Sequence, residues 1–151
     1  MLSLGPTAEF LRALWRLNHV LERASRRMEA VCGITSQQRM IVRWIGRFPG
    51  MTAGQLATHF HLDPGTVSVA IDRLERKGLV ERRRAERDRR RVMLGLTAAG
   101  RAIDAAVVGP AERALSELRD SAATEDLVAA RCLLVSLATL VDSALEQDRS
   151  G

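Results

Sequence analysis

Hydrophobic residues recur every three or four positions through most of the chain, which is the spacing of one face of a helix. The first such run predicts an amphipathic helix from Thr7 to Val31, ended by Gly33. Its apolar stripe comprises Phe10, Leu14, Leu17, Leu21, Ala24, Met28 and Val31. Because these residues alternate by four and three, the stripe has a heptad-like repeat.

Three shorter helices follow, each with a start signal. Thr35 with Gln38, and Thr52 with Gln55, fit the capping box, and Asp63 precedes Pro64 as a helix cap. The residues expected to face inward are Met40, Ile41, Trp44 and Ile45, then Leu56, Ala57 and Phe60, and then Val67, Ile71 and Leu74. A tight turn separates the last two helices, which predicts a helix-turn-helix.

The remaining pattern predicts a hairpin and two more helices. The strands are expected at 79–83 and 92–96, because the second alternates apolar and polar residues. Thr97 is expected to cap a helix to about Arg119, bent at Gly109-Pro110, and Thr124 to cap the last one. The apolar face of that last helix is too wide for one neighbour. The predicted fold is mainly α with a small β-hairpin wing, a winged helix-turn-helix.

Charge changes this picture by pointing to a partner. The 151 residues carry a net charge of +5, and cations outnumber acids only before residue 98. Seven arginines crowd the hairpin tip between 81 and 91. A solvated surface is the ordinary explanation of such a run, but a helix-turn-helix directly before it favours a wing that enters the DNA minor groove.

The second helix of the pair is the candidate for the major groove. Its outward positions include Thr66, Ser68, Val69, Arg73 and Arg76. Thr66 and Val69 suit thymine methyls, because the first turns lack the Arg, Asn or Gln that read bases by paired hydrogen bonds. We therefore expect weak direct readout of bases. Phosphate contacts are assigned to Arg73, Arg76, Lys77 and the wing.

Several short motifs recur together between residues 34 and 101. They are TSQQ at 35–38, FPGMT at 48–52, QLA at 55–57, DRLERKGLVER at 72–82, DRR at 88–90 and LTAAGR at 96–101. This combination resembles the MarR family of transcription regulators. The family commonly has a serine and an arginine at the positions of Gly65 and Val69.

The resemblance implies a homodimeric repressor of a pseudo-palindromic DNA operator. It implies dimerisation helices at 1–33 and 98–151 around a DNA-binding domain at 34–97, all in one intertwined unit. At the wing it implies that Asp88 braces the tip and Arg90 reaches DNA, next to the DNA contacts that the arginine run itself predicts for Arg84, Arg87 and Arg89. It also implies a phenolic or lipophilic effector, for which Trp15, His19 and Trp44 are the candidate pocket residues.

Other functions have less support from the residues. No catalytic set, cofactor motif or metal-ligand spacing can be assembled, so we expect no enzyme, cofactor or metal site. Two alternatives stay open: Cys32 could be a redox sensor, and Gly65 and Val69 could reflect a loss of DNA binding. Cys132 is expected in a core. We expect a cytoplasmic protein, without signal peptide or membrane-spanning run.

Overall fold

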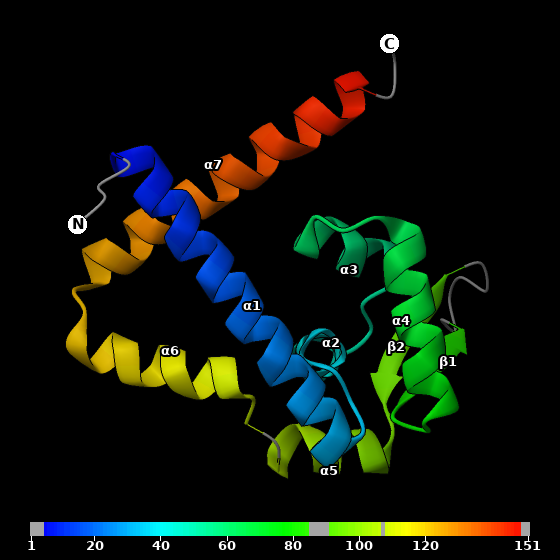
Figure 1. Ribbon diagram of the computed structural model, residues 1–151. Coiled ribbons are helices and arrows are strands. Elements are labelled where there is room, and N and C mark those ends of the chain that lie inside the picture. The colour runs from blue at the N-terminus through cyan, green and yellow to red at the C-terminus, as the bar shows by residue number, and fades with distance from the viewer. Residues whose placement is uncertain (1–4, 85–90, 107, 149–151) are drawn as a thin grey trace. The chain divides into compact units, whose positions relative to one another are not determined.

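The computed structural model describes residues 5–84, 91–106 and 108–148 (Figure 1). The elements are α1 (Pro6–Cys32), α2 (Ser36–Arg47), α3 (Ala53–Phe60), α4 (Pro64–Arg76), β1 (Val80–Arg84), β2 (Val92–Leu96), α5 (Ala98–Ala106), α6 (Pro110–Ser121) and α7 (Thr124–Asp148). The chain divides into two compact units, Met1–Ala111 and Glu112–Gly151. The predicted fold class, mainly helical with one antiparallel hairpin, is confirmed.

The first unit is built around one hydrophobic core. Its fully buried side chains come from α2, α3, α4 and the hairpin, and include Ile41, Leu56, Ile71, Leu74 and Val80. Cys32, Trp44 and Ile103 pack against this core from outside it. These elements enclose the inner face of α4 and leave its opposite face to solvent.

The helices begin where the sequence predicts, because their caps are local. Thr35 Oγ1 accepts from the Gln38 amide at 3.2 Å and Gln38 Oε1 accepts from the Thr35 amide at 3.3 Å, which completes a capping box. Thr52 and Gln55 form the second box in the same way. Asp63 Oδ1 accepts from the Thr66 amide at 3.0 Å and so caps α4.

The hairpin pairs β1 with β2 in antiparallel register, from Val80 opposite Leu96 to Arg84 opposite Val92. On its other edge β2 meets the segment after α2: the Gly50 amide donates to the Leu94 carbonyl at 3.2 Å, and the Leu94 amide to the Met51 carbonyl at 2.7 Å. These bonds attach the hairpin to the helical core, so its base has a defined position next to α4.

Three sequence expectations about these elements are wrong. Met40 is exposed and Val42 is fully buried instead, because periodicity alone left two adjacent faces of α2 possible. The helix expected from 98 to 119 is two helices, since α5 ends at Ala106 and α6 begins at Pro110, where proline lacks the amide that a continuous helix needs. The last helix includes Thr124 as its first residue, where we had expected a cap.

The second unit exposes its apolar residues. Within the described residues of this unit, none is buried, and Leu133 and Leu140 of α7 are 59% and 68% exposed. By length and composition alone α7 could cross a membrane, which corrects the expectation that no segment is apolar enough. Core helices of water-soluble proteins pass the same test, so an apolar protein partner is an equally direct explanation.

Candidate nucleic-acid interface

One stripe of α4 faces solvent and carries most of the predicted contact residues. Gly65, Val69, Arg73 and Arg76 follow one another at intervals of one helical turn, and all are exposed. Thr66 beside them is exposed too. Val67, Ala70, Ile71 and Leu74 are buried on the opposite side and hold the helix against the core. The stripe therefore combines a small apolar patch at the start of α4 with two cations at its end.

Ser68 differs from the other predicted contacts because it is half-buried. It lies one turn before Asp72, which faces the hairpin through an ion pair with Arg82. Ser68 is therefore on the side of α4 nearest the hairpin, at the edge of the solvent-facing stripe.

Arg82 ties the hairpin to α4, a role that the sequence analysis missed. Its guanidinium hydrogen-bonds Asp72 Oδ1 at 2.6 Å and also pairs with Glu75. The hydrogen bond to Asp72 raises the pKa of Arg82 above its ordinary value, against the opposing effect of burial and with a further contribution from Glu75. Two acids one turn apart on α4, followed by an arginine-rich strand, were the available sequence signal. The pairs fix β1 beside the solvent-facing stripe.

The arginines of the hairpin have different surroundings. Arg84 and Arg91 are exposed at the ends of the two strands, with Arg91 Nη2 at 3.5 Å from Gln55 Oε1. Arg83 is exposed and paired with Glu81. Arg87, Asp88, Arg89 and Arg90, all predicted to contact DNA, lie outside the described residues.

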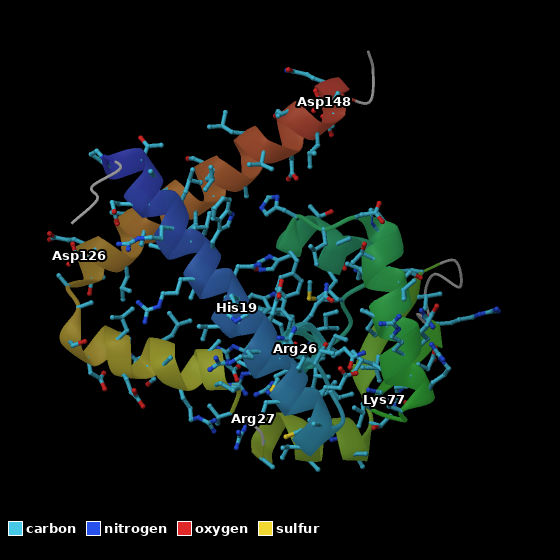
Figure 2. All side chains as sticks on the ribbon, in the orientation of Figure 1. His19, Arg26, Arg27, Lys77, Asp126 and Asp148 are labelled. Atoms are coloured by element: carbon cyan, nitrogen blue, oxygen red, sulfur yellow. The ribbon has the colours of Figure 1, made fainter. Side chains whose placement is uncertain are left out.

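Lys77, to which we assigned a phosphate contact, is exposed and also bonds neighbouring parts of the fold. Its ammonium donates to the Gly33 carbonyl at the end of α1 and to Gln38 Oε1 at 3.4 Å. It lies at the end of α4 (labelled in Figure 2) and joins this helix to the turn between α1 and α2. Its charge neutralises carbonyl dipoles within the fold.

A buried ion pair links α2 to α5 away from this face. Arg39 is 4% exposed, and its Nη1 lies 3.0 Å from Asp104 Oδ1. The exposed Arg43 approaches the same oxygen at 3.3 Å. A charge as buried as that of Arg39 needs such a partner, so Asp104 holds α5 against α2.

The three candidate effector residues are not brought together by ring contacts. Trp44 stacks with Phe48, His59 and Phe60, with centroids 4.8 to 5.8 Å apart. Its indole nitrogen is buried and, within the described ranges, has no hydrogen-bond partner. Trp15 and His19 are exposed one turn apart on α1, and His19 is labelled in Figure 2.

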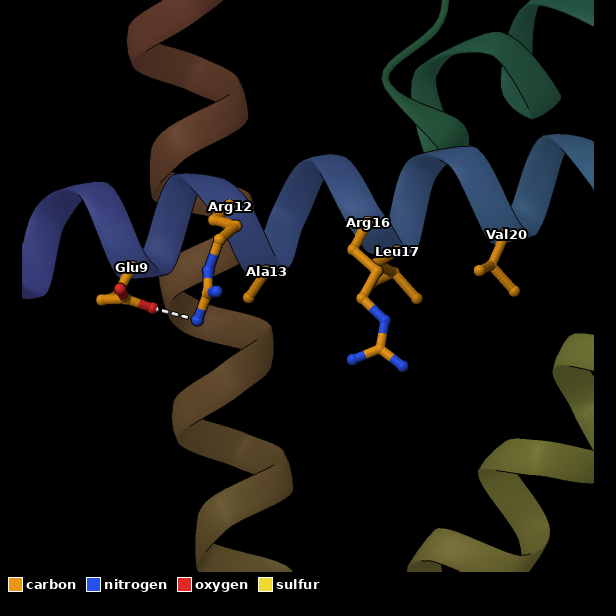
Figure 3. A pocket seen from close by; sticks show the side chains of 6 residues that line it. All are labelled: Glu9, Arg12, Ala13, Arg16, Leu17 and Val20. Carbon is orange, nitrogen blue, oxygen red and sulfur yellow. Dashed lines mark hydrogen bonds and ion pairs between the residues drawn. The ribbon is translucent and has the colours of Figure 1, made fainter. Parts of the chain in front are cut away.

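A hollow on the described surface lies along α1, and none of these three residues lines it. It has a volume of about 520 Å³ and is lined by Glu9, Arg12, Ala13, Arg16, Leu17 and Val20, whose side chains project on one side of the helix (Figure 3). Glu9 and Arg12 pair across it. One open helix face with such a mixture of charge and apolar surface does not enclose a small molecule.

The cysteines do not lie in similar surroundings. Cys32 is half-buried against the core, whereas Cys132, expected in a core, is exposed on α7. Nowhere in the described ranges do three His, Cys, Asp or Glu side chains gather as a metal site requires.

Comparison with known proteins shows which family this arrangement is similar to. Residues 33–91 match the model described as "MarR family". BilQ of Clostridium symbiosum, an HTH-type transcriptional regulator, is 35% identical over 68 residues, which are 45% of this chain and 47% of BilQ. YsmB of Bacillus subtilis, an uncharacterized HTH-type transcriptional regulator, is 26% identical over 80% of this chain and 82% of its own.

Among solved structures, Streptococcus pneumoniae FabT in complex with DNA is similar, with 26% identity and a TM-score of 0.63. The similarity covers 91% of this chain and 96% of FabT. The match to BilQ spans about half of that protein, whereas the match to FabT extends over both units of this chain.

Proposed function

Since residues 33–91 match the MarR family model, we propose that this chain is a winged helix-turn-helix regulator of that family, binds duplex DNA as a homodimer and represses transcription. The observation that carries the proposal is the solvent-facing stripe of α4, fixed beside an arginine-rich strand by Arg82. Two adjacent, mutually braced elements of this kind fit neighbouring grooves of one duplex. That FabT has been crystallised with DNA supports the proposal.

The proposed division of labour follows from the side chains. α4 enters the major groove, where Thr66, Ser68 and Val69 meet base edges, while Arg73 and Arg76 contact phosphates. Arg84 begins the wing contacts. From the sequence we extend them to Arg87, Arg89 and Arg90, with Asp88 bracing the tip, and assign them to the minor groove.

Unpartnered apolar surface in each unit supports a homodimer. In the first unit, Trp15 and Val31 of α1 are 72% and 76% exposed, and in the second Leu133 and Leu140 are exposed. Patches of this kind mark protein interfaces. We assign dimerisation to 1–33 and 98–151 and DNA binding to 34–97, and a two-fold dimer then requires a pseudo-palindromic operator.

Regulation by a phenolic or lipophilic effector is part of the proposal, as is action in the cytoplasm. The unpaired indole nitrogen of Trp44 is a donor suited to a phenolic oxygen. A saturable quench of tryptophan fluorescence by a phenol would support contact with Trp44 or Trp15. A flat titration across a broad phenolic panel would count against it.

The test of DNA binding is a salt titration of the purified chain on random and selected duplexes. Six to ten phosphate contacts predict a loss of roughly 10³ to 10⁵ in affinity between 50 and 200 mM salt. Arg76→Ala should flatten this dependence, while Arg23→Ala on α1 is the matched control for loss of one exposed arginine. A dimer that binds no duplex at low salt would instead support an interaction protein that has lost DNA binding.

A further inference from the structure

A hollow of about 350 Å³ lies between the start of α2 and the solvent-facing stripe of α4. The N-cap Thr35 and Gln37 of α2 line one side of it, and Gly65, Thr66, Val69 and Arg73 of α4 line the other. We infer that this hollow receives the C5 methyl of one thymine in each half-site, so that the protein selects sequence by an apolar contact. The inference rests on the DNA binding proposed above and names what that surface recognises.

The apolar part of the hollow arises from two neighbouring positions on α4. Gly65 contributes no side chain, and a Cβ added there would lie 2.8 Å from Asp63 Oδ1. Val69, one turn later, is 49% exposed, and Ala70 beneath it is buried. A single exposed valine is common on protein surfaces. Here it stands in a concave site, in the middle of the face that we assign to DNA.

The charges around the hollow suit a major-groove edge. Arg73 is the charged side chain that lines it, and no acidic side chain does so among the described residues. The carboxylate of Asp63, the N-cap residue of α4, accepts a hydrogen bond from the Thr66 amide. A cationic rim therefore attracts the phosphates, while the apolar floor remains for a base.

Among the four bases, thymine complements this surface best. In the major groove thymine presents a C5 methyl beside the O4 acceptor, whereas guanine presents two acceptors and adenine an acceptor and a donor. The Thr66 hydroxyl is a donor available for O4. Reading guanine would need an arginine directed at the base from the first turns of α4, and the residue that lines the hollow there is Val69.

The size of the effect follows from the area of one methyl group. Burying a methyl-sized group corresponds to about a fourfold gain in affinity, or about 15-fold for two half-sites of a dimer. Uracil lacks only this methyl, so replacing thymine with uracil removes the contact while preserving base pairing and hydrogen bonding.

The experiment begins with selection of duplexes from a random pool by the full chain. Uracil then replaces thymine at one symmetric position at a time in the selected duplex, and affinity is measured by fluorescence anisotropy at fixed salt. We expect one position at which uracil weakens binding about 15-fold. At that position 5-methylcytosine should bind more tightly than cytosine by a similar factor. If uracil changes affinity less than twofold at every position, the inference is wrong.

Variants assign the effect to the hollow. Val69→Ala should bring the ratio of thymine to uracil affinity close to one, and Gly65→Ala should reduce it by filling the hollow. Arg76→Ala is the control, because it should weaken binding to both duplexes equally. Circular dichroism verifies the fold of each variant. A ratio unchanged in folded Val69→Ala would overturn the assignment, whereas failure to enrich any sequence would overturn the proposed function itself.

Discussion

The segment from α2 to β2 and the helix α7 are both rich in hydrophobic residues, yet only the first buries them within the chain. Ile41, Ile71 and Leu74 are at most 1% exposed, whereas Leu133 and Leu140 are more than half exposed. The difference lies in the neighbours: α2, α3, α4 and the hairpin supply the first core, and residues of α1 and α5 pack against it. Composition alone therefore does not say which apolar residues stabilise the single chain and which await a partner.

Helix α1 shows both behaviours along its length. Met28, near its end, is 5% exposed, and Ser25 Oγ accepts from the Ser36 amide at 3.0 Å, so this part is joined to α2. Trp15, nearer the start, is exposed. Helix α1 therefore carries both a residue buried against its own unit and apolar residues that remain exposed.

The largest effect is expected from a cavity in the self-sufficient core. Leu74→Ala should lower the free energy of unfolding by about 2 to 5 kcal/mol, because it removes buried methyl groups without allowing collapse. Urea denaturation followed by circular dichroism measures it. Met40→Ala on α2 is the control for loss of an exposed side chain, and its effect should be within about 0.5 kcal/mol. Equal losses in the two variants would show that the burial pattern is wrong.

The second effect concerns the buried ion pair at the edge of that core. Asp104→Ala should cost about 3 kcal/mol, since it leaves the Arg39 guanidinium buried without this carboxylate. Arg43 approaches the same carboxylate but is largely exposed, so Arg43→Ala should cost about 0.5 kcal/mol. Urea denaturation of the two variants measures both losses in the free energy of unfolding. A loss for Arg43→Ala as large as that for Asp104→Ala would mean that burial does not set the strength of this pair.

The sequence predicted these elements as far as local interactions determine them. The boxes at Thr35 and Thr52 and the cap at Asp63 involve residues three positions apart, and all three formed as expected. The contacts that Lys77 and Arg82 make within the fold were missed, because their partners depend on packing between elements. Lys77 reaches a carbonyl 44 residues away in sequence. A long cationic side chain can contact either DNA phosphates or another element of the same chain, and the sequence does not distinguish these two roles.

Close approaches between elements were also hidden from the sequence. A Cβ on Gly100 would lie 2.0 Å from the Leu79 carbonyl oxygen, so glycine allows α5 to begin directly against the start of the hairpin. The motif at 96–101 identified this position as a family feature without giving its physical cause. The predicted DNA contacts at the wing tip stay predictions, since Arg87, Asp88, Arg89 and Arg90 lie beyond the described ranges.

A third, smaller effect is expected from changes to the exposed apolar residues of α7. Replacing both Leu133 and Leu140 with glutamine should raise the dissociation constant of a homodimer about 30-fold, because two exposed apolar side chains lose their apolar contacts. Analytical ultracentrifugation across a concentration series measures this. The control pair is Glu117→Gln with Asp120→Gln on α6, which changes polar side chains only. A wild-type chain that is monomeric at all concentrations would exclude the homodimer.

The smallest expected effect on stability concerns the ion pairs that join the hairpin to α4. Arg82→Ala removes a partly exposed arginine from Asp72 and Glu75, and the loss in unfolding free energy should be about 1 kcal/mol. Its effect on DNA affinity should be larger, because β1 would lose the contact that aligns it with α4. Arg83→Ala, which removes a neighbouring arginine of the same strand paired only locally with Glu81, is the matched control. If Arg82→Ala weakened DNA binding no more than Arg83→Ala, the two groove-binding elements would be independent, and the stripe of α4 would need no support from the hairpin.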